Sequence, residues 1–331
     1  MRSTDRLFIA LTTAAALLAA GATVSGSASA QSYPTKPIKM IIPYPPGGPV
    51  DAFARGFAEK LGSLWGQTIV LDNRPGANEI IAADATAKSA PDGYTLLLAA
   101  DPALSQNQFL FAKLPYDPEK DLIPVSRVVD VNMVLIVKGD LPVTNLKDFI
   151  AFMKKEGAKR NFGSAGNGNV TQLAFEAFKR DAGFEMTHIP FKGIAPAISD
   201  MLGGSIDAMF AGSTAATPHL KSGKMKVLAI SGAKRARSLP DVPTFAEAGF
   251  PKTEARFYLG LSAPRGTPNA IVQKIAADVR RSMTDKAFLE RFVDLNGFDA
   301  AGTTPEEFAQ FLKADRVVSG QRIRSAGVKL D

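Results

Sequence analysis

The sequence contains no cysteine and only two histidines, His188 and His219, in 331 residues. Without cysteine the chain has no disulfide, no thiolate nucleophile, no zinc ribbon and no iron–sulfur ligand. Two histidines cannot build a three-histidine metal site, and no H-E-x-x-H motif is present. These absences exclude most zinc enzymes, and we expect neither a bound metal nor a cofactor.

The composition is that of a globular protein. Hydrophobic residues make up 46% of the chain and charged residues 21%, which argues against disorder and collagen-like repetition. The length suggests roughly two domains.

The first thirty residues have the pattern of a secretory signal peptide. Arg2 and Arg6 form a basic start, residues 7–24 are apolar, and residues 28–30 read Ala-Ser-Ala, a small-residue cleavage site. A membrane anchor is the alternative, but the stretch is rich in alanine and only weakly hydrophobic. We therefore expect a periplasmic protein whose mature chain begins near Gln31.

The formal net charge is +7 at pH 7. A basic protein attracts acidic small molecules, nucleic acid or anionic membranes. The basic clusters here are mixed with acidic residues and lack interleaved aromatic residues, as at positions 280–294. This pattern indicates solvated faces, so we expect no nucleic-acid partner.

Short β-branched runs alternate with amphipathic stretches, which is typical of an α/β fold. Two longer apolar runs, 131–137 and 257–262, could each carry the chain between two lobes. The predicted organisation is a signal peptide (1–30), a first lobe (31–131 with 256–331) and a second lobe (132–255). Strands are predicted at 38–42, 68–71, 95–98, 161–163, 186–190, 206–210 and 227–231, and helices at 51–64, 146–155, 171–182, 269–283 and 305–313.

Glycine-rich loops follow predicted strands in both lobes. Gly47 and Gly48 follow the first strand, and Gly166 and Gly168 follow a strand of the second lobe. In open α/β sheets ligands bind at the carboxyl ends of strands, where helix N-termini present free N–H groups to anions. Ordinary turns and helix caps are the alternative for any one loop. The recurrence in both lobes favours an anion site in a cleft.

Several motifs, in order along nearly the whole mature chain, carry a resemblance to one family. They are Tyr44-Pro45-Pro46-Gly47-Gly48 with Asp51 and Arg55, Asn73-Arg74-Pro75-Gly76-Ala77, Pro91-Asp92-Gly93-Tyr94, Phe162-Gly163-Ser164-Ala165-Gly166, Phe191-Lys192-Gly193, Leu202-Gly203-Gly204 with Asp207, and Leu239-Pro240-Asp241-Val242-Pro243-Thr244. Together these motifs resemble the Bug-type periplasmic receptors of tripartite tricarboxylate transporters.

The resemblance implies a type II periplasmic-binding-protein fold, the two-lobed Venus flytrap with a doubly wound sheet in each lobe and two crossover strands. It implies a non-enzymatic, monomeric receptor that captures a small organic carboxylate and delivers it to inner-membrane permease subunits; a sensor kinase is a further candidate partner. The implied ligand-binding residues are Tyr44, Gly47, Gly48, Asp51, Ala99, Ala100, Asp101, Ser164, Ala165, Gly168, Thr171, Phe191, Lys192, Gly193 and Asp207.

The chain departs from the family pattern at a few positions. Asn78 and Glu79 stand where two glycines are usual, and Gln172 stands where histidine is common. Glu79 is expected either to pair with Arg74 on the surface, the favoured alternative, or to face the cleft and prefer a ligand with an amino group. Phe191 replaces a common tyrosine, which suggests a ligand with a hydrocarbon or aromatic body.

A secreted serine hydrolase or acyltransferase is the alternative function. Ser231 and Lys234 fit the S-x-x-K pattern of serine acyl-enzymes. The companion S-D-N and K-T-G motifs are missing, and the serine ends a predicted strand. The missing motifs and the position of Ser231 at the end of a strand therefore favour a structural role for this residue.

Overall fold

The computed structural model describes residues 33–330 except 233, 237, 252 and 254, so the predicted signal peptide lies outside the described residues. Residues 1–35 and 36–331 form separate units, and the description below concerns the second. No helix among the described residues is long and apolar enough to cross a membrane.

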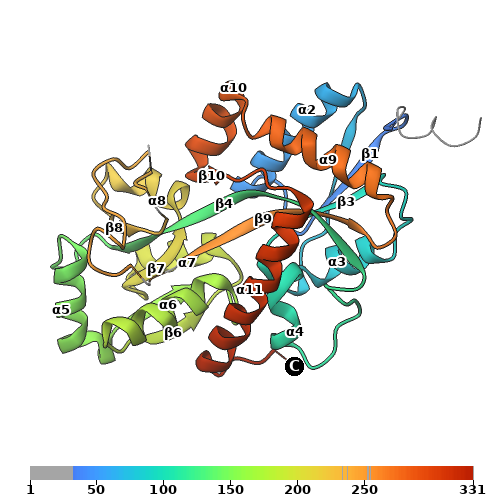
Figure 1. Ribbon diagram of the computed structural model, residues 1–331. Helices are drawn as coiled ribbons and strands as arrows, with labels where there is room; N and C mark the ends of the chain where they lie inside the picture. Colours follow the sequence, from blue (N-terminus) through green and yellow to red (C-terminus); the bar gives the residue numbers. More distant parts are fainter. Residues whose placement is uncertain (1–32, 233, 237, 252, 254, 331) are drawn as a thin grey trace, which may run out of the picture. The chain divides into compact units, whose positions relative to one another are not determined.

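The second unit is an α/β structure (Figure 1). Its strands are β1 (Ile38–Ile42), β2 (Ile69–Asn73), β3 (Thr95–Ala99), β4 (Leu122–Lys138), β5 (Asn161–Ser164), β6 (Thr187–Pro190), β7 (Ala208–Gly212), β8 (Met225–Ile230), β9 (Arg256–Pro264) and β10 (Phe298–Ala300). Its α-helices are α2 (Pro49–Trp65), α3 (Ile80–Ala87), α4 (Asn107–Leu110), α5 (Leu146–Glu156), α6 (Val170–Ala182), α7 (Ile194–Gly203), α8 (Ser213–Leu220), α9 (Asn269–Ser282), α10 (Lys286–Phe288) and α11 (Pro305–Ala326).

The strands join into one mixed sheet whose order is β2-β1-β3-β9-β4-β7-β5-β6, with β8 and β10 also paired to β4. β1 runs parallel to β2 and β3, and β5 runs parallel to β6 and β7. These parallel groups match the α/β pattern predicted from the sequence.

The long strand β4 connects the two parallel groups. Its residues up to Asn132 pair with β9 and β10, and from Met133 onward it pairs with β7 and β8 (Figure 1). Met133, Leu135 and Val137 pack in one hydrophobic cluster, whereas Val134 and Ile136 pack in another. Alternate residues of a strand point to opposite faces, so the continuous apolar run of β4 reflects burial on both faces.

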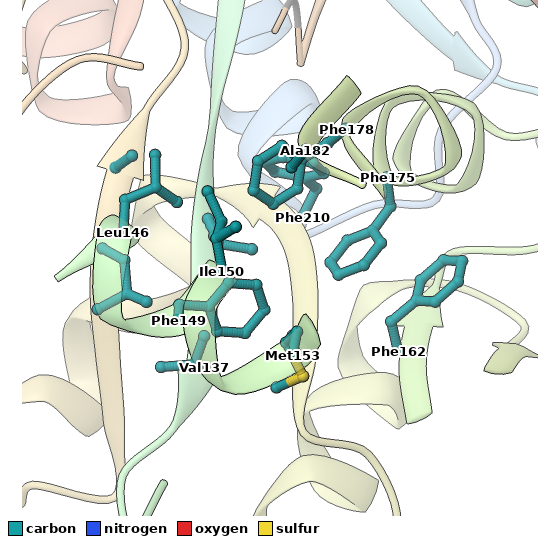
Figure 2. Packing of buried hydrophobic residues seen from close by; sticks show 14 of the residues in the cluster. Val137, Leu146, Phe149, Ile150, Met153, Phe162, Phe175, Phe178, Ala182 and Phe210 are labelled. Atoms are coloured by element: carbon teal, nitrogen blue, oxygen red, sulfur yellow. The ribbon is translucent and has the colours of Figure 1, made fainter. Parts of the chain in front are cut away.

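Aromatic side chains fill the core around α5 and α6. Phe162 of β5 stacks on Phe175 of α6, with ring centroids 4.1 Å apart, and Phe149 of α5 lies against Phe178 (Figure 2). Phe210 of β7 completes the contact with α6. Each such buried aromatic contributes about 2 kcal/mol of hydrophobic stabilisation, which holds α6 and its preceding loop firmly against the sheet.

Candidate functional site

The first group of predicted ligand-binding residues lies where β1 and β3 end. These strands are parallel neighbours, so their carboxyl ends share one edge of the sheet. The loop with Tyr44, Gly47 and Gly48 follows β1, and Ala100 and Asp101 follow β3. We call this group, which also includes Asp51 and Ala99, the β1/β3 edge.

Asp51 braces the loop of the β1/β3 edge. Its carboxylate is 2% exposed and accepts hydrogen bonds from Gly47 N at 2.9 Å, Asn73 Nδ2 at 2.9 Å and the Arg55 guanidinium at 2.8 Å. Burial alone would raise the pKa of Asp51, but the bonds from Arg55, Gly47 and Asn73 outweigh burial and hold it below its usual value. Since its oxygens are engaged, Asp51 shapes the loop and keeps Gly47 in place.

Glu79 is the unexpected member of the β1/β3 edge. It is 7% exposed, accepts a hydrogen bond from Tyr44 Oη at 2.5 Å, and accepts another from Ala100 N at 3.0 Å. Arg74 pairs with Asp72 at 2.9 Å. The favoured expectation of a surface pair between Arg74 and Glu79 is therefore wrong, because Glu79 turns inward to the ends of β1 and β3.

The inward turn depends on an unusual backbone. Ala77, Asn78 and Glu79 all have positive φ, at 46°, 49° and 71°, a region that favours glycine. Asn78 is held there by two hydrogen bonds with Asn107 of α4, at 2.7 and 2.8 Å. Burial raises the pKa of Glu79 to about 7, although bonds from Tyr44, Ala100 and Ala103 counteract it.

Asp101 is buried beside Glu79. The side chain is 5% exposed; one oxygen contacts Gln106 Nε2, and the other, Oδ1, has no hydrogen-bond partner. Burial, with the charges of Asp315 and Glu79 nearby, raises the pKa of Asp101 well above its usual range. The same burial and the charge of Glu79 raise the pKa of Tyr44 well above its usual value. The β1/β3 edge thus holds three buried carboxyl groups, those of Asp51, Glu79 and Asp101.

The second group of predicted residues lies where the parallel strands β5 and β6 end. We call it the β5/β6 edge: Ser164, Ala165, Gly168, Thr171, Phe191, Lys192 and Gly193. Phe191 N donates to Ser164 O at 3.0 Å, which joins the two loops.

Side chains within the loop already engage several of its amides. Ala165 N donates to Thr171 Oγ1 at 2.9 Å, and Gly168 N donates to Gln172 Oε1 at 2.7 Å. Ser164 is fully buried, and its Oγ lies 2.7 Å from His188 Nε2. The structure thus makes Ser164, Thr171 and Gln172 supports of the loop.

Gly168 faces a hydrophobic contact. A Cβ placed on it would lie 2.8 Å from Leu330 Cδ1 and 3.1 Å from Leu110 Cδ2. Leu110 also clusters with Leu173 of α6 and Ile323 of α11. This contact brings the loop of the β5/β6 edge next to α4, which follows the β1/β3 edge. It leaves Gly168 covered by side chains of its own chain.

Gly193 is the open glycine of the β5/β6 edge. It has φ 114°, and a Cβ on it would meet no atom within 4 Å. It precedes α7, which has no side-chain cap. Lys192 beside it is exposed, whereas Phe191 is half-buried and packs over Gly163.

The structure places Asp207 away from both edges. Asp207 precedes β7, pairs with Arg160 at 3.2 Å, and accepts from Asn161 N at 3.2 Å. These residues are at the amino ends of β5 and β7. Ser164 lies three residues farther along β5, or ~10 Å at the rise of a strand. Sequence alone could not show this, because the strand ends were predicted only approximately.

Two helices offer backbone N–H groups at these edges. Helix α2 starts after Gly48 and helix α7 after Gly193, and neither has a side-chain cap. A Cβ on Gly47 would also meet open space. Free amides at a helix start and the positive end of the helix dipole favour a carboxylate or another anion. By contrast, Asn169 caps α6 and Thr304 caps α11.

The geometry gives Ser231 a structural role. Its side chain is 1% exposed, its hydroxyl donates to Ala255 O, and it accepts from Met133 N at 3.0 Å. Lys234 is exposed. Ala233, between them, lies outside the described residues. Within the described part of the chain, no cluster of three or more His, Cys, Asp or Glu could hold a metal ion.

Two surface hollows lie elsewhere. One, of about 610 Å³, is lined by residues including Arg127, Arg280 and Glu307, and the other is lined by parts of α2 and β2. Neither lining includes a predicted ligand-binding residue.

Comparison with known proteins supports a solute-binding function. The family model for the tripartite tricarboxylate transporter family receptor, TctC, matches residues 53–328. Protein BugT of Bordetella pertussis is 36% identical over 312 residues, which are 94% of this chain and 95% of BugT.

Two solved structures with ligands are similar along nearly their whole length. Rpa4515 of R. palustris with adipate has 31% identity and a TM-score of 0.81, covering 90% of this chain and 99% of the other. MatC of Rhodopseudomonas palustris with bound malate has 30% identity and a TM-score of 0.75, covering 88% of this chain and 100% of the other. Both ligands are small organic acids.

Proposed function

Since this chain belongs to the tripartite tricarboxylate transporter receptor family, whose members are periplasmic solute-binding proteins, we propose that it binds a small organic carboxylate and delivers it to the membrane permease subunits of such a transporter. The bound adipate and malate of the two similar structures support this class of ligand. The chain would capture its ligand without altering it.

The ligand would bind between the β1/β3 edge and the β5/β6 edge. The observation that carries this proposal is that helices α2 and α7 both start without a side-chain cap beside glycines with open space. The direct contacts would come from the loop at Tyr44, Gly47 and Gly48 and from the loop at Phe191, Lys192 and Gly193. Asp51, Ser164 and Thr171 would hold these loops in shape. The half-buried ring of Phe191 would favour a ligand with a hydrocarbon body.

We further propose two lobes, 31–131 with 256–331 and 132–255. The change of β4 pairing partners between Asn132 and Met133 supports this boundary. Closure about β4 and the start of β9 would exclude water from the ligand and strengthen its hydrogen bonds to backbone amides.

The remaining proposals concern export, oligomeric state and partners. Residues 1–30 would be removed on export, so that the mature chain begins near Gln31. The receptor would act as a monomer, without cofactor or catalysis. Its partners would be the permease subunits, and a sensor kinase is a further candidate.

The two glycines that flank α7 provide a test of this placement. Gly193 and Gly204 both have positive φ, at 114° and 88°, and a Cβ on either meets open space. The ψ angles differ, however: Gly193 has ψ 176°, a region that glycine alone adopts readily, whereas Gly204 has ψ 6°, near the left-handed region. Gly193→Ala therefore carries the larger backbone strain, and circular dichroism must show that this variant is folded. Only Gly193→Ala places a methyl group at the amide end of α7.

Titration calorimetry with adipate and malate should show at least a tenfold loss of affinity in Gly193→Ala. Gly204→Ala should bind these acids like the unmodified chain. Equal affinities in the two variants would contradict the placement of the carboxylate at the start of α7.

A further inference from the structure

The backbone before α3 places the carboxylate of Glu79 in a buried position. Positive φ angles at Ala77, Asn78 and Glu79 bend the segment, and the two bonds between Asn78 and Asn107 hold the bend. The side chain of Glu79 is thereby aimed at the ends of β1 and β3.

Glu79 engages hydrogen-bond donors of the kind that a ligand carboxylate would use. Oε2 accepts from Ala100 N at 3.0 Å and from Ala103 N at 3.4 Å, and Oε1 accepts from Tyr44 Oη at 2.5 Å. In the described part of the chain no lysine, arginine or histidine forms an ion pair with Glu79. The donors at the end of β3 are thus already occupied by an acid of the chain itself.

An open acceptor lies next to this carboxylate. Asp101 follows Ala100 directly and is 5% exposed, and its Oδ1 is buried without a hydrogen-bond partner. Gln106 Oε1, also buried, lacks a partner as well. A buried acceptor without a donor is costly, so a ligand that donates a hydrogen bond here would gain more than one that only accepts.

We propose that Glu79 is a specificity-determining residue. Its carboxylate accepts the hydrogen bonds of the backbone amides at the β1/β3 edge and so excludes a second ligand carboxylate there. Together with Asp101, it selects a monocarboxylate whose far end donates hydrogen bonds. This inference rests on the proposed function and narrows its ligand class. The carboxylate of the ligand would bind at the start of α7, and its ammonium or hydroxyl end would face Glu79 and Asp101.

Charge and hydrogen bonding both favour a donor group over a second carboxylate at the β1/β3 edge. A second ligand carboxylate at the β1/β3 edge would find Ala100 N and Ala103 N already engaged by Glu79, and it would meet a like charge wherever Glu79 is ionised. An ammonium or hydroxyl group would meet acceptors instead. Removing the Glu79 side chain would release both amides for a ligand carboxylate.

The test uses pairs of acids with the same frame that differ only at one end. The pairs are 4-aminobutyrate with succinate, 6-aminohexanoate with adipate, and 4-(aminomethyl)benzoate with terephthalate. Titration calorimetry would compare the unmodified chain, Glu79→Gly and Glu79→Gln. Glu59→Gln, an exposed residue of α2, removes the same charge away from the site. Circular dichroism would establish that each variant is folded.

We expect the unmodified chain and Glu59→Gln to prefer the amino acid of a pair at least tenfold over the diacid. Glu79→Gly should shift this preference at least tenfold toward the diacid. Glu79→Gln should shift it less, because the amide still fills the space. A preference of the unmodified chain for diacids, or an unchanged preference in folded Glu79→Gly and Glu79→Gln, would overturn the inference alone. Binding of no carboxylate by any variant would overturn the proposed function itself.

Discussion

Asp51 and Glu79, both buried at the β1/β3 edge, have pKa values that are shifted in opposite directions. Asp51 accepts from the Arg55 guanidinium and two further donors, so its charged form is favoured and its pKa is lowered. Glu79 has three neutral donors and no cationic partner among the described residues, and burial raises its pKa to about 7. Burial opposes ionisation of both groups; it dominates at Glu79, whereas at Asp51 the hydrogen bonds from Arg55, Gly47 and Asn73 outweigh it.

The raised pKa of Glu79 makes stability depend on pH. The unfolded chain ionises Glu79 near its usual 4.5 and the folded chain near 7, so folded Glu79 binds more protons in this range. Its contribution to stability is therefore complete below pH 4.5 and is lost as the pH rises to about 7, by about 3 kcal/mol. Urea unfolding should show this loss in the unmodified chain and its absence in Glu79→Gln. Parallel pH profiles would contradict the burial of an ionisable Glu79.

The titration of His188 tests its contact with Ser164, which supports the loop of the β5/β6 edge. Burial, with the nearby charge of Lys179, lowers its pKa to about 4. At neutral pH the ring is uncharged and contacts Ser164 Oγ. As the pH falls from 6.5 to about 4, the unfolded chain takes up this proton first, and the protein should lose stability.

NMR titration can follow the ring directly because the chain has only two histidines. We expect one imidazole signal to titrate near pH 4, and His188→Gln should remove it. A signal of His188 that titrates at its usual value near 6.5 would show that the ring is solvated and that Ser164 lacks this partner.

Side-chain caps alone do not separate structural from binding helices, because α3, α8 and α9 also start without one. What sets α2 and α7 apart is a preceding glycine with open space at its Cβ position. Thr304 and Glu307 form a reciprocal capping box at the start of α11, and Asn169 caps α6. The starts of α2 and α7 have no such side chain. An uncapped start leaves N–H groups for a ligand, whereas a capped start is stabilised by about 1 kcal/mol.

The glycines at the two ends of α2 test the first of these helices. Gly47, before the helix, and Gly66, after it, have φ 88° and 62°, and both Cβ positions are open. Gly47→Ala should weaken binding of adipate, malate or 4-aminobutyrate at least tenfold because its methyl group would stand in the space proposed for the ligand. Gly66→Ala should change stability similarly and leave affinity unchanged. The measurement is titration calorimetry, and equal affinity in both variants would remove α2 from the site.

Elements were easier to predict than contacts between them. Short apolar runs such as Ile38–Ile42 and the helical spacing of Phe53, Phe57 and Leu61 depend on local sequence, and both predictions are confirmed. The same local rules place α6 within one residue, at Val170–Ala182. Helix α11, however, extends to Ala326, well beyond the predicted end at 313, because its apolar face is set by distant partners such as Leu110.

Over the whole molecule, the family and the α/β fold could be predicted because their motifs run in order along the chain; both are confirmed. Side-chain roles that depend on tertiary contacts could not. Glu79 turns inward because its φ angle is positive, which is unusual for glutamate and could not be expected from the sequence. Gly168 is covered by Leu330, which is distant in the sequence. Asp207 falls at the opposite ends of β5 and β7 because strand ends are poorly defined by periodicity.

The strand β4 pairs with β9 along its first part and with β7 and β8 along its second. Its Met133 N is bonded to Ala255 O at 2.9 Å, so the proposed lobe boundary coincides with a point where the chain leaves and returns. A receptor that closes on its ligand would bend at this point and leave the paired strands on either side intact.

The most direct test of the central claim is native mass spectrometry of the protein purified from the periplasm of cells that express the full chain. We predict a polypeptide mass that starts at Gln31, together with a bound small organic acid that is lost on denaturation. A protein that retains residues 1–30, or that carries no small acid and gains none when adipate, malate, 4-aminobutyrate or 4-(aminomethyl)benzoate is added, would contradict the account.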